Sequence, residues 1–488
     1  MQRETMKKHW LAGVTACALA AALTAPIALA ASVAKVGGSC TRKQANKTIG
    51  TLICKKEGSK YIYREVQVTA VTAATIAPVA APGATNNTVA AAAADDLKGT
   101  KITFFHWRAE DKDVIASIIK DFTAKTGIEV DQSIKNSNDY QSQALQDILD
   151  GKPADVFTAF RGAQFFNMAK ANGGSVWLDL SNQPFVKNYN KNLIAPGSFD
   201  GKQLGLPYQL VFNMPLVNVD LLKQLGLTLP QTINDLQRFC LAVKAKNITP
   251  IVWPGGVRGN AGQLSMNGLV MNIMPTDNGF EQIDTGQAKV TDFWMTKSLQ
   301  TFKEISEDCF QDNPLGTRDD GALADFATGK ALMLATGTFS MGPALRLNPK
   351  LSFDLYAPIT TPPGQTPKWE GIYNATFIVG VNARQKDAKK QAAAIQFVDW
   401  LSQPENAAKY ANGTSQHSTV NGVKYVTKEL QDTGAWAGKR VFLAPRFQFL
   451  NLDVRNAVED AVLAVAGGSD PKKAAADAQA VIDQKLGR

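Results

Sequence analysis

Histidine and cysteine are scarce in this sequence, with three histidines and five cysteines among 488 residues. There is no C-x-x-C pair and no cysteine–histidine cluster, so neither a metal site nor another cofactor is expected. G-x-S-x-G, H-E-x-x-H and G-x-x-x-x-G-K-[ST] are also absent, which argues against the common serine-hydrolase, zinc-protease and phosphate-loop chemistries. His417 stands in the polar stretch SQHSTVNG and is expected to face solvent. No catalytic residue is predicted, and the chain is not expected to be an enzyme.

Long apolar runs are confined to the N-terminus. Residues 1–30 are predicted to be a secretory signal peptide, because basic residues precede the apolar stretch Trp10–Ala31, which contains Ala28-Leu29-Ala30. No later segment is long and apolar enough to span a membrane. The apolar run before Cys17 is too short for a lipoprotein signal, so lipidation is not expected. The protein is therefore predicted to be secreted or extracytoplasmic, either released or held at the cell surface.

Most of the chain has no excess of positive or negative charge. The formal net charge is +9, but residues 1–65 alone hold eleven lysines and arginines against three acidic residues. The rest of the chain is close to neutral, which argues against nucleic acid as its partner.

The cysteines that follow the predicted signal peptide are even in number, as expected for disulfides in an exported protein. Cys40 and Cys54 are predicted to join within one small module. Cys240 and Cys309 would then close a loop of about seventy residues, which the chain-entropy treatment values at roughly 4 kcal/mol.

Residues 31–66 are predicted to form a small basic module, with strands at Thr51–Cys54 and Tyr61–Val66 around a turn. This segment resembles small cysteine-containing modules of exported actinobacterial proteins. Residues 33–66 could contact an anionic cell-wall polymer, or serve only as a solvated spacer. Residues 67–96 are rich in alanine, threonine and proline and are predicted to be a flexible linker.

Strand and helix patterns alternate from residue 101 onward, which predicts β-α-β units and a parallel sheet. The predicted strands are Lys101–His106, Ile128–Ser133 and Asp155–Ala159, and the helices between them are Asp113–Thr126 and Tyr140–Leu149.

The stretch Leu323–Met341 combines a helix, a glycine bend at Gly329, a buried strand at Ala331–Ala335 and a small-residue loop at Thr336–Phe339. In α/β proteins such loops at the carboxyl ends of strands face ligands. The overall fold class is therefore predicted to be α/β.

Five segments in this order resemble the extracellular solute-binding proteins of bacterial ABC transporters, in the sugar-binding group that includes maltose-binding protein. The resemblance covers roughly residues 101–488. The segments are KITFFHWRAE with FTAKTGIEV; Gly151, Pro153, Asp155 and Val156; LPYQLVFNMPLVNVDLLKQLGLTLPQTINDLQRFC; Phe326, Gly329, Lys330, Ala331, Met333 and Gly337; and AIQFVDWLSQPENAAKYA.

The resemblance implies a type II periplasmic-binding-protein fold, in which two α/β lobes are joined by a hinge and enclose a central cleft. Carried onto this sequence, lobe one would comprise residues 101–209 and 369–425. Lobe two would comprise residues 210–368 and 426–488. The small disulfide-stapled β module would precede both lobes.

The implied function is capture of a sugar or oligosaccharide outside the cell and its delivery, by lobe closure, to an ABC permease in the membrane. A monomer is expected. Two alternatives stay open: an exported carbohydrate-active hydrolase with a carboxylate pair such as Glu110 and Glu370, and a receptor for a non-sugar solute. Because the candidate loops mix arginine with tryptophan, a neutral or acidic ligand is expected rather than a polyamine.

A sugar cleft needs aromatic side chains that stack on C–H faces and polar side chains that bind hydroxyls, placed on loops after strands. Arg446 is expected to cap a helix rather than to face the cleft. The predicted ligand-binding residues are Trp107, Arg108, Glu110, Phe160, Arg161, Tyr208, Gln209, Trp253, Phe339, Trp369, Glu370, Tyr373 and Asn374.

Overall fold

The structure is a computed structural model that describes residues 48–49, 52–57, 59–65, 94–357 and 366–488. The predicted signal peptide, the predicted Cys40–Cys54 disulfide and nearly all of the predicted linker lie outside the described residues. The chain divides into two compact units, residues 1–86 and 87–488. Each unit is described separately.

The described part of the first unit is a three-stranded antiparallel sheet in the order β1-β2-β3. Its strands are β1 (Thr48–Ile49), β2 (Leu52–Glu57) and β3 (Lys60–Glu65), and Cys54 lies opposite Tyr63 in the hairpin. The hairpin expected in this module is present, with both strands reaching closer to the turn than predicted.

The second unit is an α/β body with two main sheets. Its strands are β4 (Lys101–His106), β5 (Glu129–Ile134), β6 (Val156–Ala159), β7 (Ser198–Phe199), β8 (Lys202–Gln203), β9 (Leu206–Phe212), β10 (Leu216–Asn218), β11 (Thr249–Val252), β12 (Ala331–Leu334), β13 (Phe353–Leu355), β14 (Gly371–Val381), β15 (His417–Ser418) and β16 (Val441–Leu443). Its α-helices are α1 (Lys112–Thr126), α2 (Ser137–Leu149), α3 (Ala163–Ala169), α4 (Val219–Gln224), α5 (Ile233–Lys244), α6 (Gly279–Thr285), α7 (Phe293–Cys309), α8 (Asp319–Ala327), α9 (Met341–Leu347), α10 (Ala388–Leu401), α11 (Pro404–Thr414), α12 (Lys428–Gly434), α13 (Leu452–Ala466) and α14 (Pro471–Leu486).

The first sheet has the order β15-β9-β14-β6-β4-β5, with β16 beside the start of β14. Strands β4, β5 and β6 are parallel as predicted, but β14 is antiparallel to both β6 and β9. The sheet is therefore mixed rather than parallel. The reason is that β9 and β14 carry the chain between the lobes in opposite directions.

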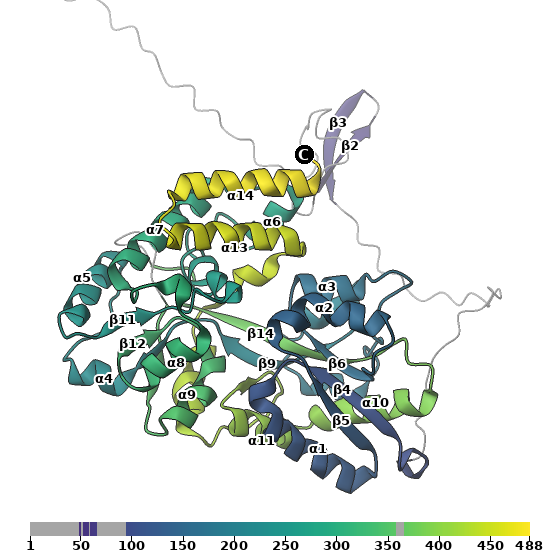
Figure 1. Ribbon diagram of the computed structural model, residues 1–488. Coiled ribbons are helices and arrows are strands. Elements are labelled where there is room, and N and C mark those ends of the chain that lie inside the picture. The colour runs from purple at the N-terminus through teal and green to yellow at the C-terminus, as the bar shows by residue number, and fades with distance from the viewer. Residues whose placement is uncertain (1–47, 50–51, 58, 66–93, 358–365) are drawn as a thin grey trace, which may run out of the picture. The chain divides into compact units, whose positions relative to one another are not determined.

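The second sheet has the order β11-β12-β10-β13, and β12 corresponds to the buried strand predicted at Ala331–Ala335. Helices α5, α7, α13 and α14 lie on one side of this sheet, whereas α8 and α9 lie on the other (Figure 1). In the first lobe, α2 and α3 cover one face of the sheet, and α1, α10 and α11 cover the opposite face (Figure 1).

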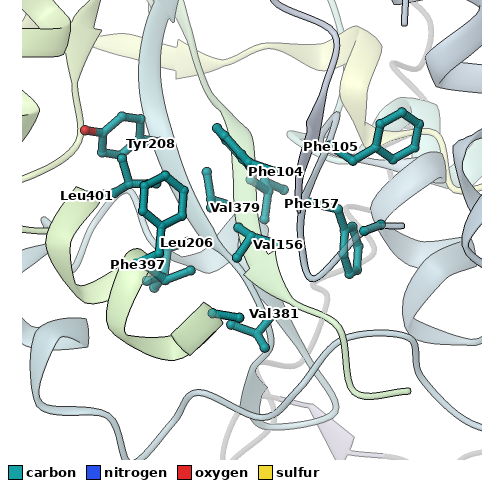
Figure 2. Close-up of a cluster of buried hydrophobic side chains, with 14 of the residues drawn as sticks. Phe104, Phe105, Val156, Phe157, Leu206, Tyr208, Val379, Val381, Phe397 and Leu401 are labelled. Carbon is teal, nitrogen blue, oxygen red and sulfur yellow. The ribbon is translucent and has the colours of Figure 1, made fainter. Parts of the chain in front are cut away.

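Aromatic and β-branched side chains fill the first lobe on both faces of its sheet. Figure 2 shows Phe104, Val156 and Val379 from three strands packed near Phe397 of α10, with Phe105 and Phe157 gathered separately. Adjacent residues such as Phe104 and Phe105 point to opposite faces because side chains alternate along a strand. These cores fix the strand ends from which the cleft is built.

Strands β9 and β14 form a two-stranded ribbon between the lobes (Figure 1). The start of β14 pairs with β16, and its end pairs with β6 of the first lobe. Phe377, in the middle of β14, has a φ of 51°. A bulky residue rarely adopts this left-handed conformation, so the ribbon holds local backbone strain of roughly 1–3 kcal/mol at this position.

The predicted Cys240–Cys309 disulfide is present and links the helices α5 and α7. Both cysteines are fully buried in the core of the second lobe. The bridge closes a loop with a sequence separation of 69 residues. It therefore restricts the unfolded chain over the segment between residues 240 and 309.

Within residues 94–357 and 366–488 and the short strands before them, no helix is both long and apolar enough to cross a membrane. In the same described part of the chain, no three histidine, cysteine or acidic side chains come together in a metal-binding group.

The expectation that His417 faces solvent is wrong. Its side chain is 1% exposed, and its Nε2 lies 2.8 Å from Oγ1 of Thr433. The imidazole packs edge-on against Phe212 and Tyr425. His417 belongs to β15, and α12 covers it. The polar sequence around it is typical of an exposed loop, but the segment lies inside the protein.

Burial lowers the pKa of His417 to about 4. This folded-state pKa is below the unfolded value of about 6.5, so the stability that neutral His417 supports is complete above about pH 6.5 and is lost as the pH falls toward 4. We expect His417→Gln to reduce the loss of unfolding free energy over that window by about 3 kcal/mol. Urea unfolding at several pH values measures this difference. Equal pH slopes in both chains would contradict it, since the other titrating groups are unchanged.

Candidate ligand-binding cleft

A cavity of about 460 Å³ is lined by residues of both lobes and of the ribbon between them. This volume lies within the range usual for small-molecule sites. Seven of the thirteen predicted ligand-binding residues line it: Trp107, Arg108, Glu110, Phe160, Gln209, Phe339 and Asn374.

Two aromatic rings from neighbouring strand ends form one wall of the cavity. Trp107 follows β4 and Phe160 follows β6, and these strands are parallel neighbours, so their carboxyl ends meet at one edge of the sheet. The two rings stack with centroids 3.8 Å apart and planes 18° from parallel. Trp107 is also packed edge-on against Phe377. The wall is therefore a rigid aromatic surface.

The guanidinium group of Arg108 is held by two carboxylates. Its Nε and Nη2 donate to Asp111 at 2.7 and 3.2 Å, and its Nη1 lies 2.9 Å from Glu110. Burial alone would lower the pKa of Arg108, but Asp111 and Glu110 raise it above its usual value. Tyr410 donates a further hydrogen bond of 2.6 Å to Asp111, and Gln209 donates to the Tyr410 hydroxyl.

The ribbon supplies a polar face to the cavity. Asn213 of the segment after β9 and Asn374 and Thr376 of β14 line the cavity. The Oδ1 atoms of both asparagines and Oγ1 of Thr376 are buried and have no hydrogen-bond partner among the described residues. Asn213 donates through Nδ2 to Gln263 at 2.8 Å, which fixes its amide orientation. A buried polar atom without a partner is costly, so these oxygens are positioned to meet a ligand.

The loop predicted to border the cleft does so. Thr336, Phe339 and Ser340 line the cavity, and the hydroxyl groups of Thr336 and Ser340 lie 2.9 Å apart. Asp319 and Asp320, at the start of α8, contribute two carboxylates on the same lobe.

Arg446 lines the cavity instead of capping a helix, contrary to expectation. Its Nε donates to Glu459 of α13 at 2.8 Å, and both side chains are almost completely buried. Its aliphatic part lies against Gly262, where an added Cβ would be only 2.3 Å from Cδ of Arg446. Any larger residue at position 262 would displace this arginine.

Three predicted residues on or beside the sheet strands do not line the cavity. Tyr208 immediately precedes Gln209, and Tyr373 immediately precedes Asn374, so alternation turns both tyrosines to the other face of the ribbon. Arg161 follows Phe160 and also lies outside the cavity lining. Burial lowers the pKa of Arg161 to about 10, although Tyr373 acts to raise it.

Trp253 is part of the second lobe's core rather than of the cavity. It is fully buried, its Nε1 donates to the Asn260 carbonyl at 3.1 Å, and its ring stacks on Phe310. The adjacent Pro-Gly-Gly segment folds closely over the ring, since an added Cβ on Gly255 would lie 2.3 Å from the Trp253 side chain.

Trp369 and Glu370 also lie outside the cavity lining. The ring of Trp369 packs on Phe442. The carbonyl of Trp369 accepts from Nδ2 of Asn272 at 2.8 Å, and its N–H donates to Oδ1 of Asn272 at 2.9 Å. Glu370 pairs with Arg440 at 3.3 Å. Glu110 and Glu370 therefore do not share the cavity as the hydrolase alternative required.

Sequence reasoning missed most of the remaining cavity residues. One group had a usable signal, because Asn136, Ser137 and Asn138 follow β5 at the same sheet edge as Trp107. The others depend on tertiary packing. The further lining residues are Ala109, Gln141, Val211, Asn213, Val257, Gly259, Asn260, Gln263, Asp319, Asp320, Leu323, Leu334, Pro343, Thr376 and Phe447.

The sequence of this chain is similar, at low identity, to those of sugar-binding proteins from bacteria. The diacetylchitobiose binding protein DasA of Streptomyces coelicolor is 24% identical over 389 residues, which cover 76% of this chain and 86% of that protein. The multiple sugar-binding protein of Streptococcus mutans is 21% identical over 68% of this chain and 78% of its own length.

Solved structures share the fold. A chitin oligosaccharide binding protein superposes with a TM-score of 0.67 at 21% identity, over 80% of this chain and 99% of that chain. RafE in complex with raffinose gives a TM-score of 0.64 at 19% identity, over 79% of this chain and 99% of that chain. Both likenesses support the two-lobed architecture.

The family described as bacterial extracellular solute-binding protein matches residues 108–408, which is more than half of the chain. The match begins at Arg108 in the cavity wall and extends through both sheets to α11. This chain therefore belongs to the bacterial extracellular solute-binding proteins.

Proposed function

We propose that this protein captures a sugar or oligosaccharide outside the cell, by closure of its two lobes, and delivers it to an ABC importer. One observation carries the proposal: a cavity between the lobes combines the Trp107–Phe160 stack with the buried, unpartnered oxygens of Asn213 and Asn374. Aromatic faces suit the C–H surface of a sugar ring, and unpartnered oxygens suit its hydroxyl groups.

The relatives support this ligand class. Two of them are named for diacetylchitobiose and for multiple sugars, and one structural neighbour was solved with raffinose bound. A shared fold alone does not determine function, so the residues of the cavity carry the argument and the names add to it.

A receptor without chemistry is part of the proposal. The carboxylate pair considered for a hydrolase, Glu110 and Glu370, is not assembled in one cavity. The proposal also includes a membrane permease as partner, an extracytoplasmic location, a monomeric state and contact of the basic segment 33–66 with anionic cell-wall polymer.

One hydrogen bond joins the two lobes beside the cavity. Nη2 of Arg455 on α13 donates to Oε1 of Gln141 on α2 at 2.5 Å, joining helices of the two lobes beside the cavity. Hydrogen bonds of this kind form and break when lobes rotate about a hinge. The ribbon of β9 and β14 is the proposed hinge.

A thermal-shift screen against mono- and oligosaccharides tests the function. A ligand at one hundred times its dissociation constant should stabilise the folded chain by about 2.7 kcal/mol and raise its melting temperature. Chromatography of the incubated sugar should show that it is unchanged. The absence of a shift with every sugar would contradict the proposed ligand class, and consumption of the sugar would contradict the receptor role.

A further inference from the structure

The charged side chains of the cavity wall are more acidic than basic. Five charged residues line it, and three of them are carboxylates. The five are Arg108, Glu110, Asp319, Asp320 and Arg446.

Both guanidinium groups of the cavity wall are paired with carboxylates of the protein itself. Each nitrogen of the Arg108 guanidinium group has a carboxylate partner: Nε and Nη2 contact Asp111, and Nη1 contacts Glu110. Arg446 is bound through Nε and Nη2 to Glu459, deep in the second lobe. Because these charge-assisted pairs offset the positive charge of each arginine, both arginines serve the protein's own carboxylates. The earlier expectation of an acidic ligand therefore loses its basis.

Asp319 and Asp320, by contrast, have no ion-pair partner within the described part of the chain. Asp319 accepts one hydrogen bond of 2.6 Å from Nδ2 of Asn260. Desolvation raises the pKa of Asp319, the Asn260 bond and Arg318 lower it, and Asp320 raises it further. Both residues lie in the first turn of α8, where the helix dipole typically stabilises a negative charge by 0.3–1 kcal/mol. This position favours two charged carboxylates at the cavity wall.

A second, independent observation points the same way. Asn213 and Asn374 are each 2% exposed, line the cavity, and leave an Oδ1 atom without a partner in the described structure. An amide oxygen can only accept a hydrogen bond. The two asparagine oxygens and the two carboxylates can only accept hydrogen bonds, and the Thr376 hydroxyl can accept or donate one. This set of groups favours a ligand rich in donors.

We infer that the ligand of this cavity is an amino sugar, whose protonated amine is bound by Asp319 and Asp320 while its hydroxyl groups donate to Asn213 and Asn374. An ammonium group has three donors and no acceptor, and its charge matches the unpaired carboxylates. This inference rests on the proposed function and narrows its ligand class.

Calorimetric titration of the full chain tests the inference with β-1,4-linked disaccharides that differ only at carbon 2. The probes are the glucosamine dimer, its N,N′-diacetyl form and cellobiose, which carry an amine, an acetamide and a hydroxyl group. The matching gluco and galacto monosaccharides extend the series, with glucuronic acid as the anionic probe and spermidine as a non-sugar cation. We expect the amine form to bind at least about tenfold more tightly than the hydroxyl form of the same skeleton.

Equal or tighter binding of the hydroxyl, acetamide or carboxylate form would overturn the inference and leave the sugar-receptor function intact. Binding of spermidine with no binding of any sugar, or no binding at all, would overturn the function as well. The two failures are thus distinguishable.

Variants separate charge recognition from general damage to the fold. The double substitution Asp319→Asn and Asp320→Asn should reduce the amine-to-hydroxyl affinity ratio to about one, because the charge that distinguishes the two forms is removed. Asp325→Asn is the matched control, since Asp325 is on the same helix, is half-buried beside Lys330 and does not line the cavity. An unchanged ratio in the double variant, with the control also unchanged, would contradict the assignment.

Discussion

Replacing Glu459 with glutamine should lower the unfolding free energy by about 3–5 kcal/mol, the cost of leaving buried charges without their partner. Glu459 is 1% exposed and is shared by two arginines, Arg446 and Arg455, each 3% exposed. Its Oε1 lies 2.8 Å from Nε of Arg446 and 3.7 Å from Nε of Arg455. Burial and the neighbouring Arg446 already lower the pKa of Arg455 to about 10, and Glu459 opposes both effects. The neutral variant would remove this opposing charge.

Urea denaturation of the two chains measures this effect. Asp460→Asn is a close control, because Asp460 is the next residue on α13 and pairs with Arg258 at an exposed position. Exposed pairs of this type contribute about 0–1 kcal/mol. A Glu459→Gln variant that is as stable as the Asp460→Asn variant would contradict a structural role for the Arg446–Glu459–Arg455 cluster.

Trp107→Ala should cost about 3–5 kcal/mol of stability and remove nearly all ligand affinity. The indole is 6% exposed and stacks on the ring of Phe160, with the two ring centroids 3.8 Å apart. Its removal leaves a void next to Phe377 and Tyr140, whose rings lie 5.0 and 5.3 Å from it. Phe160 would then lose the surface that holds its ring in place.

Two further variants divide stability from binding. Phe160→Ala removes a partly exposed ring, so we expect a smaller loss of stability with a similar loss of affinity. Trp107→Phe retains an aromatic ring and should recover part of both. Equal affinity of Trp107→Ala and the parent chain for the same sugar would contradict the role of this stack.

The strands and helices of the first lobe could be predicted because their signals are local. Apolar periodicity placed β4, α1 and β5 within one or two residues of their observed bounds. The loop after β12 was also identified, because a glycine bend and a short apolar strand determine where the chain turns. Such elements carry their own boundary signals in the sequence.

The cavity could be predicted only in part, because strand alternation has two possible phases. Gln209 lines the cavity and Tyr208 does not, yet the sequence gives no sign of which of the two neighbours faces inward. The predicted positions of Trp253 and His417 were wrong for a related reason. Their sequence neighbours are glycine-rich or polar, yet segments distant in the sequence cover both side chains. Long-range packing decided these positions.

Charge pairing was equally inaccessible from sequence. The partner of Arg446 lies thirteen residues away on α13, and the partners of Arg108 are its near neighbours Glu110 and Asp111. Whether an arginine in a cleft binds a ligand or a carboxylate of its own chain depends on side-chain geometry. This difference changed the expected ligand from neutral or acidic to basic.

The most direct test of the central claim is calorimetric titration of the parent chain and of a Phe160→Ala, Asn374→Ala double variant with the sugar that gives the largest thermal shift. The parent should bind one sugar per chain, and the variant should bind at least about a hundredfold more weakly, since a stacking surface and a buried acceptor are both lost. A parent chain that binds no carbohydrate, or a variant that binds as tightly as the parent, would contradict the account.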